Sequence, residues 1–273
     1  MTHHCFENDF VTLYYYKYGN GPNAMLCFHG YGMHGKQFKI LEAGLGQKYT
    51  FYGFDLFFHQ ETKLKDQRLP IIKKGISKHQ LAELITAFCK YEGINSFSLI
   101  GYSMGTHYAT AIAEELAPCV NEYIAAAPSC LNPGRVALFF SKNKIGNKVL
   151  EKVALSKKLP LILLNSLRRL KLIDGEAFKI LQNEIGTPDM RFNLYACFTY
   201  LRFLETSPAR LAAAIEGQNI KCIFIFGKRD KIFPYNKNNP VLAKLKTAEI
   251  IISDAGHDMI KRGFAATLTG ILV

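Results

Sequence analysis

Short apolar runs alternate with helix-like stretches along most of this chain. Runs such as 24–28 and 97–100 are hydrophobic on both faces, which is typical of parallel strands that are covered by helices. The stretch 105–117 follows one such run and repeats alanine at every fourth position, which predicts a helix that packs closely on a sheet. This alternation predicts an α/β fold with a doubly wound, mostly parallel sheet.

Residues 10–18 and 133–217 depart from this alternation. The first stretch is rich in tyrosine and ends at a Gly-Asn-Gly-Pro turn signal, which predicts an antiparallel edge strand. The second is predicted to form successive helices, and it carries 14 Lys or Arg against 7 Asp or Glu. We therefore predict a core formed by 1–132 and 218–273, with a basic helical block over 133–217 inserted between strands 6 and 7.

The pentapeptide Gly-Tyr-Ser-Met-Gly at 101–105 joins a predicted strand to a predicted helix. A serine on such a sharp turn has an exposed hydroxyl and a strained backbone, and crowding requires small residues two positions to each side. Gly101 and Gly105 meet that need around Ser103. The helix that follows directs its positive N-terminal end at developing negative charge. The pattern predicts Ser103 as a nucleophile.

An acid and a histidine follow later in the chain, in the order that this turn requires. A serine hydroxyl is a weak nucleophile at neutral pH, so it needs a base, and the base needs an orienting partner. Asp230 and His257 each lie in the loop after a late apolar run. Asp254 and Asp258 flank the histidine, but such close neighbours rarely reach a ring nitrogen in line. The predicted catalytic triad is therefore Ser103, Asp230 and His257.

The early segment His29-Gly30-Tyr31-Gly32 supplies the other expected part of the site. An oxyanion hole needs backbone amides directed at the developing charge, usually one after the nucleophile and one from an early strand-to-helix loop. These predict the amides of Met104 and Tyr31. Tyr31, Tyr102 and Met104 are also expected to bind substrate as apolar walls of the pocket.

Together these motifs resemble those of the α/β-hydrolase superfamily, close to its capped, serine esterase-like members. The resemblance runs from about residue 10 to the C-terminus and includes Gly227-Lys228-Arg229-Asp230 and Gly256-His257. It implies that 133–217 is a helical cap that covers the serine and excludes water. It also implies a structural role for Asp55. The sequence Leu56-Phe57-Phe58-His59 replaces the family's glycine-rich continuation, and His29 and His59 are expected to be structural.

Composition and charge indicate in which compartment the protein is located and which partners it has. The chain has 273 residues, 49% of them hydrophobic, and no apolar run long enough to span a bilayer. Its first residues lack the pattern of a secretory signal, and its seven cysteines are widely spaced, so a cytoplasmic setting is expected. The net charge of +12 comes without a nucleic-acid motif. Residues 30–36 match a phosphate loop, but Gln37 stands where Mg²⁺ requires a hydroxyl.

We therefore expect a hydrolase that cleaves a carboxylic ester or thioester through an acyl-enzyme, with no cofactor and no metal. A small-molecule acyl substrate is expected, without nucleic acid and without stable membrane insertion. Three alternatives stay open at this point. The same triad could serve a lyase or a carbon–carbon bond hydrolase, the basic helical block could recruit an anionic acyl carrier, or the fold could bind a ligand without catalysis.

Overall fold

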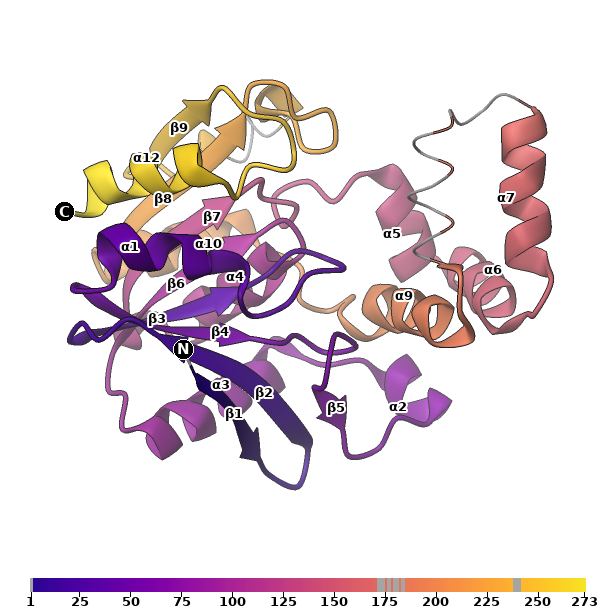
Figure 1. Cartoon of the computed structure of the whole chain (residues 1–273), viewed down its shortest axis with the longest axis horizontal. Coiled ribbons are helices and arrows are strands. Elements are labelled where there is room, and N and C mark those ends of the chain that lie inside the picture. The colour runs from indigo at the N-terminus through magenta and orange to yellow at the C-terminus, as the bar shows by residue number, and fades with distance from the viewer. Residues whose placement is uncertain (1, 171–174, 176–177, 179–181, 183–184, 238–241) are drawn as a thin grey trace. The chain divides into compact units, whose positions relative to one another are not determined.

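The computed structural model describes residues 2–170, 175, 178, 182, 185–237 and 242–273 (Figure 1). Within them the chain forms two compact units. The first, called the α/β unit here, comprises Met1–Asp66, Ile76–Pro133 and Leu204–Val273. The second, the helical unit, comprises Gln67–Gly75 and Gly134–Phe203.

A single mixed sheet forms the centre of the α/β unit. Its order is β1-β2-β4-β3-β6-β7-β8-β9, and the short β5 pairs with β2. Strands β3, β4, β6, β7, β8 and β9 pair in parallel, and β1, β2 and β5 pair antiparallel. The predicted doubly wound, mostly parallel sheet is thereby confirmed. The strands are β1 (Thr2–Glu7), β2 (Val11–Tyr18), β3 (Asn23–Phe28), β4 (Tyr49–Phe54), β5 (Lys63–Leu64), β6 (Phe97–Tyr102), β7 (Val120–Ala126), β8 (Lys221–Gly227) and β9 (Glu249–Ser253).

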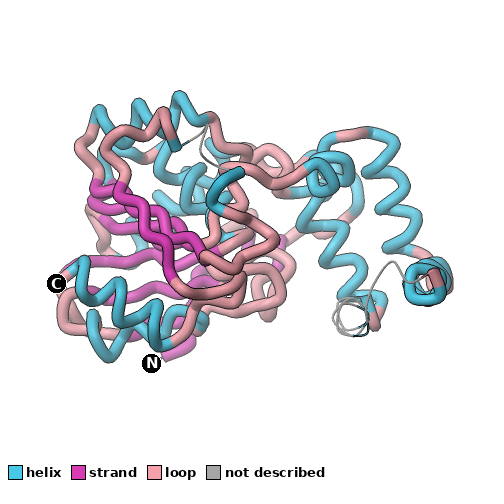
Figure 2. Tube along the Cα trace, turned by 90° about the horizontal axis from the view of Figure 1, so that it is seen from above, coloured by secondary structure: helices cyan, strands magenta, loops and turns pink. Residues whose placement is uncertain are grey.

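Helices cover both faces of this sheet (Figure 2). On one face, the buried side chains Phe264, Leu268 and Leu272 of α12 pack into a core with residues of β3, β6, β7 and β8. On the other face, α4 contacts β6 and β7 and is flanked by α3 and α10. All six residues of β6 are buried, as its continuous apolar run predicts. The helices of this unit are α1 (Glu42–Leu45), α3 (Lys78–Glu92), α4 (Gly105–Glu115), α10 (Pro208–Gly217) and α12 (Arg262–Leu272).

Local sequence signals explain where several helices begin and end. Ser77 and Gln80 form a capping box at the start of α3, and Gly93 ends that helix with a φ of 71°. In the helical unit, the Asn143 side chain accepts from the amides of Ile145 and Gly146 and so caps the next helix. These caps satisfy amides that have no partner within the helix.

The helical unit consists of short helices gathered around α9. Helix α9 contacts α2, α5 and α6, and α6 contacts α7. Lys73 of α2 forms a 2.8 Å ion pair with Glu151 of α6, and the Arg202 guanidinium donates to the Lys73 carbonyl. The described helices are α2 (Leu69–Lys74), α5 (Arg135–Lys142), α6 (Lys144–Leu155), α7 (Leu159–Arg169) and α9 (Pro188–Tyr200).

The bounds of this unit differ from the division predicted at 133–217. Helix α10 packs on α4 of the α/β unit, and the Ser207 amide before it donates to the Glu114 carboxylate at 3.0 Å. The helical stretch separates β7 from β8, and not the sixth strand from the seventh as predicted. The strand numbering differs because the sequence pattern does not predict β1, which is mostly polar, or β5, which has only two residues. Part of the predicted helical block, between 171 and 184, falls largely outside the described residues.

Candidate active site

Ser103 lies in the turn between β6 and α4, and its backbone has a left-handed conformation that glycine usually adopts. Its φ is 49°, and its amide donates to the Ala126 carbonyl of β7 at 3.0 Å. The neighbouring glycines are required by space. A Cβ at Gly105 would lie 1.9 Å from the Phe28 carbonyl oxygen, and one at Gly101 would lie 2.8 Å from the Gly105 oxygen. The spacing G-x-S-x-G therefore follows from the packing of strand against helix.

A cluster of hydroxyl groups holds the carbonyl of Ser103 in place. That oxygen accepts from the Thr106 amide at 3.0 Å, the Thr106 hydroxyl at 2.6 Å and the Ser129 hydroxyl at 2.8 Å. Thr106 and Ser129 are both buried. Sequence reasoning missed them. The position of Thr106 in the first turn of the helix could have indicated its contact with the Ser103 carbonyl. No motif near Ser129 in the sequence predicts the contact that Ser129 makes with the same carbonyl.

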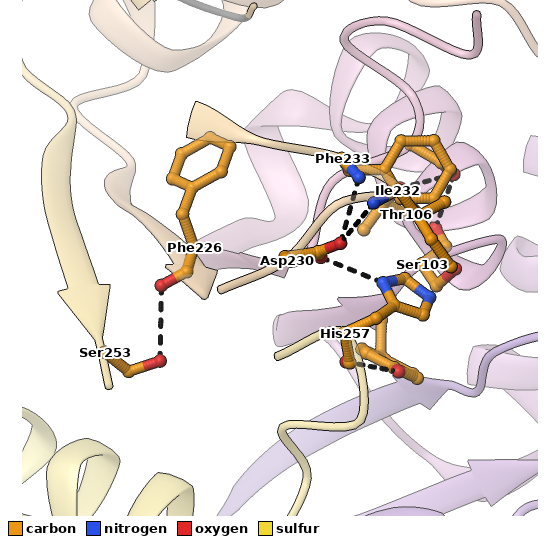
Figure 3. Close-up of polar contacts among 10 residues, drawn as sticks. Ser103, Thr106, Phe226, Asp230, Ile232, Phe233, Ser253 and His257 are labelled. Atoms are coloured by element: carbon orange, nitrogen blue, oxygen red, sulfur yellow. Dashed lines mark hydrogen bonds and ion pairs between the residues drawn. The ribbon is translucent and has the colours of Figure 1, made fainter. Parts of the chain in front are cut away.

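Asp230 and His257 are brought together by the loops after β8 and β9. The Nδ1 of His257 lies 2.9 Å from Oδ2 of Asp230. The other carboxylate oxygen accepts from the amides of Ile232 at 2.8 Å and Phe233 at 3.0 Å. In Figure 3 the imidazole of His257 lies between Asp230 and Ser103. The carboxylate is fully buried and fully engaged, so it fixes the orientation of the ring.

Backbone contacts tie these two loops to each other. The amide of Lys228 donates to the Ser253 carbonyl at 2.8 Å, and the amide of Arg229 donates to the Ala255 carbonyl at 2.9 Å. A Cβ at Gly227 would lie 2.7 Å from the carbonyl oxygens of both Ala255 and Gly256. Glycine at 227 therefore allows the acid loop and the histidine loop to approach closely.

The two acids that flank His257 in the sequence point elsewhere. The side chains of Asp254 and Asp258 are 79% and 76% exposed. Asp254 lies 3.7 Å from the Arg229 guanidinium, and Asp258 lies 2.7 Å from the Lys261 ammonium. The carboxylate on the His257 ring is that of Asp230.

Tyr102 connects the histidine loop with the early glycine loop. Its hydroxyl donates to the His257 carbonyl at 2.7 Å, and the two rings lie 5.4 Å apart. A Cβ at Gly30 would lie 2.8 Å from the Tyr102 ring. The side chain is buried, and burial raises the pKa of its phenol, which keeps the hydroxyl a neutral donor. The structure thus places Tyr102 behind both loops.

Two buried histidines shape the loop that carries Tyr31. His29 Nε2 accepts from the Leu56 amide at 3.1 Å, so its Nδ1 donates to the Gly30 carbonyl at 2.7 Å. His59 Nε2 accepts from the Gly32 amide at 3.0 Å, and its Nδ1 donates to the Phe57 carbonyl. Burial holds the pKa of His29 well below 6.5 and also lowers that of His59. Both rings are therefore neutral, as their hydrogen bonds require.

The two residues predicted to supply oxyanion donors lie at the ends of adjacent strands. Met104 is the N-cap of α4, directly after Ser103, and Tyr31 follows β3, which pairs with β6. Both side chains are partly exposed, and the Tyr31 ring packs against His59 at 5.3 Å. Among the described residues, the Met104 amide donates to no oxygen. It is therefore available to a ligand beside Ser103.

Asp55, expected to be structural, supports the neighbouring loop. One of its oxygens accepts from the Gly35 amide at 2.7 Å, and the other has no hydrogen-bond partner among the described residues. Burial raises the pKa of this carboxyl. In the part of the chain that the structure describes, no group of three or more His, Cys, Asp or Glu side chains is arranged to hold a metal ion.

Comparison with known proteins agrees with this architecture. A family model described as the alpha/beta hydrolase fold matches residues 23–148, which include Ser103 and the loop around Tyr31. A search of curated proteins finds no match.

Solved structures of hydrolases superpose on nearly the whole chain. A thermophilic esterase from Thermogutta terrifontis is 15% identical, with a TM-score of 0.68 over 96% of this chain and 92% of that one. A structure reported for carboxylesterases of Nitrososphaera gargenis is 13% identical, with a TM-score of 0.68 over 99% and 97%. A putative epoxide hydrolase from Pseudomonas aeruginosa is 18% identical, with a TM-score of 0.65 over 99% and 95%. At these identities the likeness is one of fold.

Proposed function

We propose that this chain, which has the α/β-hydrolase fold, is a serine hydrolase that cleaves a carboxylic ester or thioester. One observation carries the proposal: His257 Nδ1 lies 2.9 Å from the buried Asp230 carboxylate, and Figure 3 draws this ring between that carboxylate and Ser103. This is the arrangement by which a base activates a hydroxyl and an acid orients the base. The esterase neighbours support the same class of reaction.

In the first half of the reaction, Ser103 Oγ attacks the substrate carbonyl carbon. His257 Nε2 accepts the hydroxyl proton, and the adjacent Asp230 carboxylate stabilises the imidazolium that forms. The amides of Met104 and Tyr31 donate to the oxyanion of the tetrahedral intermediate. When this intermediate collapses, the bond to the leaving group breaks, and His257 delivers its proton to the departing alkoxide or thiolate.

In the second half, water takes the place of the serine hydroxyl. His257 removes a proton from water, the resulting hydroxide attacks the acyl carbon, and the bond to Ser103 Oγ breaks as the serine regains its proton. Every proton and bond in this cycle is accounted for by the chain's own residues, the substrate and water. Substrate contact by Tyr31, Tyr102 and Met104, and a cap formed by 133–217, stay predictions.

Labelling with a fluorophosphonate probe tests the nucleophile. Wild-type protein is expected to react at Ser103, and Ser103→Ala should show no labelling. His257→Ala should lose labelling almost as completely, because the members of a triad act as a unit. Labelling that survives in Ser103→Ala, or that equals wild type in His257→Ala, would contradict the proposal.

A matched pair of substitutions tests the acid. Asp230→Asn should lower kcat by about 10⁴, because it removes the charge that holds the imidazole tautomer. Asp254→Asn removes an equal charge from an exposed side chain on the loop that carries His257 and should leave kcat near wild type. The assignment is wrong if Asp254→Asn proves the more damaging change.

Product analysis tests the reaction class. A chain-length series of p-nitrophenyl esters and matched thioesters should be hydrolysed in a Ser103-dependent manner, with the preferred length reporting the acyl pocket. A β-dicarbonyl compound tests carbon–carbon cleavage, and an epoxide tests the activity suggested by the putative epoxide hydrolase. Ser103-dependent turnover of either of these, without turnover of esters, would assign another reaction to the same site.

A further inference from the structure

Helix α7 of the helical unit exposes a stripe of large apolar side chains. Leu159, Ile162 and Leu163 of α7, and Leu170 directly after its last residue, are 44%, 56%, 46% and 68% exposed. Their spacings of three, four and seven residues place them along one side of the helix. Only Pro160 and Leu164 of this helix are buried. A contiguous exposed apolar surface of this kind marks an interaction site.

Cationic side chains border this stripe and no acid accompanies them. From Lys152 to Ile173 the sequence has no Asp or Glu, and it has six Lys or Arg: Lys152, Lys157, Lys158, Arg168, Arg169 and Lys171. Among the described residues, no carboxylate pairs with Lys157, Lys158 or Arg169. On a helix of 3.6 residues per turn, Lys158 and Arg169 fall beside Ile162, along one margin of the stripe.

The side of α7 that faces α6 and α9 lines a pocket of about 150 Å³ that is partly open to solvent. Leu163, at the edge of the stripe, and Leu164 and Leu167 form the wall of this pocket on α7. Among the described residues that line it, Arg191 is the one polar side chain. The exposed apolar surface of the stripe therefore continues into an apolar pocket beside it.

We propose that α7 and its flanking cations are a docking surface for a lipid bilayer with anionic headgroups. The apolar stripe would lie in the acyl boundary of the bilayer, and the cations would lie at the level of the phosphates. An acidic soluble partner would match the charges but not the row of leucine and isoleucine. In the described part of the chain no helix is long and apolar enough to cross a membrane, so this docking is peripheral. The inference does not depend on the proposed hydrolase activity.

Vesicle co-sedimentation of the full chain tests the proposal. Vesicles of phosphatidylcholine with about a third phosphatidylserine should bind the wild type, and pure phosphatidylcholine should bind it at least about tenfold more weakly. Binding to the anionic vesicles should also weaken as salt rises from about 0.1 M to about 1 M, because exposed charges are screened.

Two variants separate the charged and apolar contributions. Lys157→Gln/Lys158→Gln/Arg169→Gln should weaken binding to anionic vesicles by about 100-fold. Ile162→Ser/Leu170→Ser should weaken it by at least about tenfold with the charge unchanged. The controls are Lys90→Gln/Lys244→Gln/Lys246→Gln, with the same charge change on the α/β unit, and Val136→Ser/Val273→Ser, with two exposed apolar side chains outside α7. Both should bind like wild type.

Several outcomes would overturn this inference. Wild type that does not sediment with the anionic vesicles, or that binds both vesicle types equally, would do so. So would α7 variants that bind no more weakly than their controls. Size measurement adds another test, since a wild-type dimer that Ile162→Ser/Leu170→Ser dissociates would show that a second copy of the chain covers the stripe. Tight binding of an acidic acyl carrier protein, lost in the triple variant, would assign the surface to that partner.

Discussion

The α/β unit buries the apolar side chains of its central elements more completely than the helical unit buries those of α5 and α7. All six residues of β6 are buried, whereas α5 buries none of its eight and α7 buries two of its eleven. In the first unit the burial of apolar residues fixes where Ser103, Asp230 and His257 lie. In the second, large apolar side chains remain in contact with solvent. Internal packing therefore specifies the α/β unit, whereas α5 and α7 of the helical unit leave most of their apolar surface available for contact with a partner.

The largest effect expected from this difference is at glycine positions. Gly105→Ala should cost more than about 4 kcal/mol of unfolding free energy, because the new Cβ would lie 1.9 Å from the rigid Phe28 carbonyl. Gly175→Ala in the helical unit is the matched control, since no described atom lies within 4 Å of its added Cβ. It should change stability by less than about 1 kcal/mol. Denaturant unfolding measures both, and equal losses would remove the contrast between the units.

Truncation of one apolar side chain in each unit gives the next largest effect. Leu99→Ala removes a fully buried side chain from β6 and should cost about 2–5 kcal/mol, from lost burial and the cavity left behind. Ile162→Ala removes a mostly exposed side chain from α7 and should cost at most about 0.5 kcal/mol. A large loss in Ile162→Ala would show that the stripe is packed inside the folded protein and would also argue against its docking role.

The same difference explains what could be predicted from the sequence. The buried strands and the turn around Ser103 were predictable, because local patterns there agree with the final packing. Strand β1 was not predictable, since its residues are mostly exposed and it is held by pairing with β2. The placement of α10 with α4 depends on contacts distant in sequence, such as that of Ser207 with Glu114. No local pattern encodes such a contact.

The candidate site likewise has some features that the sequence predicts and others that it does not. Ser103 and its glycines are specified by a pentapeptide, and the loops of Asp230 and His257 by strand ends, so these positions were predictable. The contact of Ser129 with the Ser103 carbonyl joins the turn after β6 to the loop after β7 and could not be predicted from the sequence. Tyr102 was expected to be a pocket wall. Its buried contact with His257 depends on the approach of β6 to the last loop, which appears only in three dimensions.

Mild acid, which protonates histidine, should lower stability through the α/β unit, because all eight histidines lie outside 67–75 and 134–203. The pKa of buried His29 lies well below its ordinary 6.5. Below pH 6.5, His29 binds a proton in the unfolded chain but stays neutral in the folded chain. The free energy of unfolding should therefore be largest above pH 6.5 and should decline as the pH falls below it. Denaturant midpoints at a series of pH values measure this. His29→Asn should give a shallower decline, and the exposed control His79→Gln should keep the wild-type slope. Identical slopes in all three proteins would show that His29 does not cause the decline.

The smallest expected effect concerns a hydroxyl that acts on Ser103 only through the backbone. Ser129→Ala removes one of three hydrogen bonds to the Ser103 carbonyl and should lower kcat by about tenfold, because the nucleophile is less firmly positioned. KM should stay near wild type, since Ser129 is buried and its hydroxyl donates to the Ser103 carbonyl. The control Ser166→Ala removes a hydroxyl that bonds a helix carbonyl in α7 and should change neither constant. Restored kcat in Ser129→Thr would show that the hydroxyl itself positions the nucleophile. If Ser129→Ala instead lowered only the fraction of folded protein, with the labelling rate of the folded fraction unchanged, Ser129 would stabilise the fold and have no influence on Ser103.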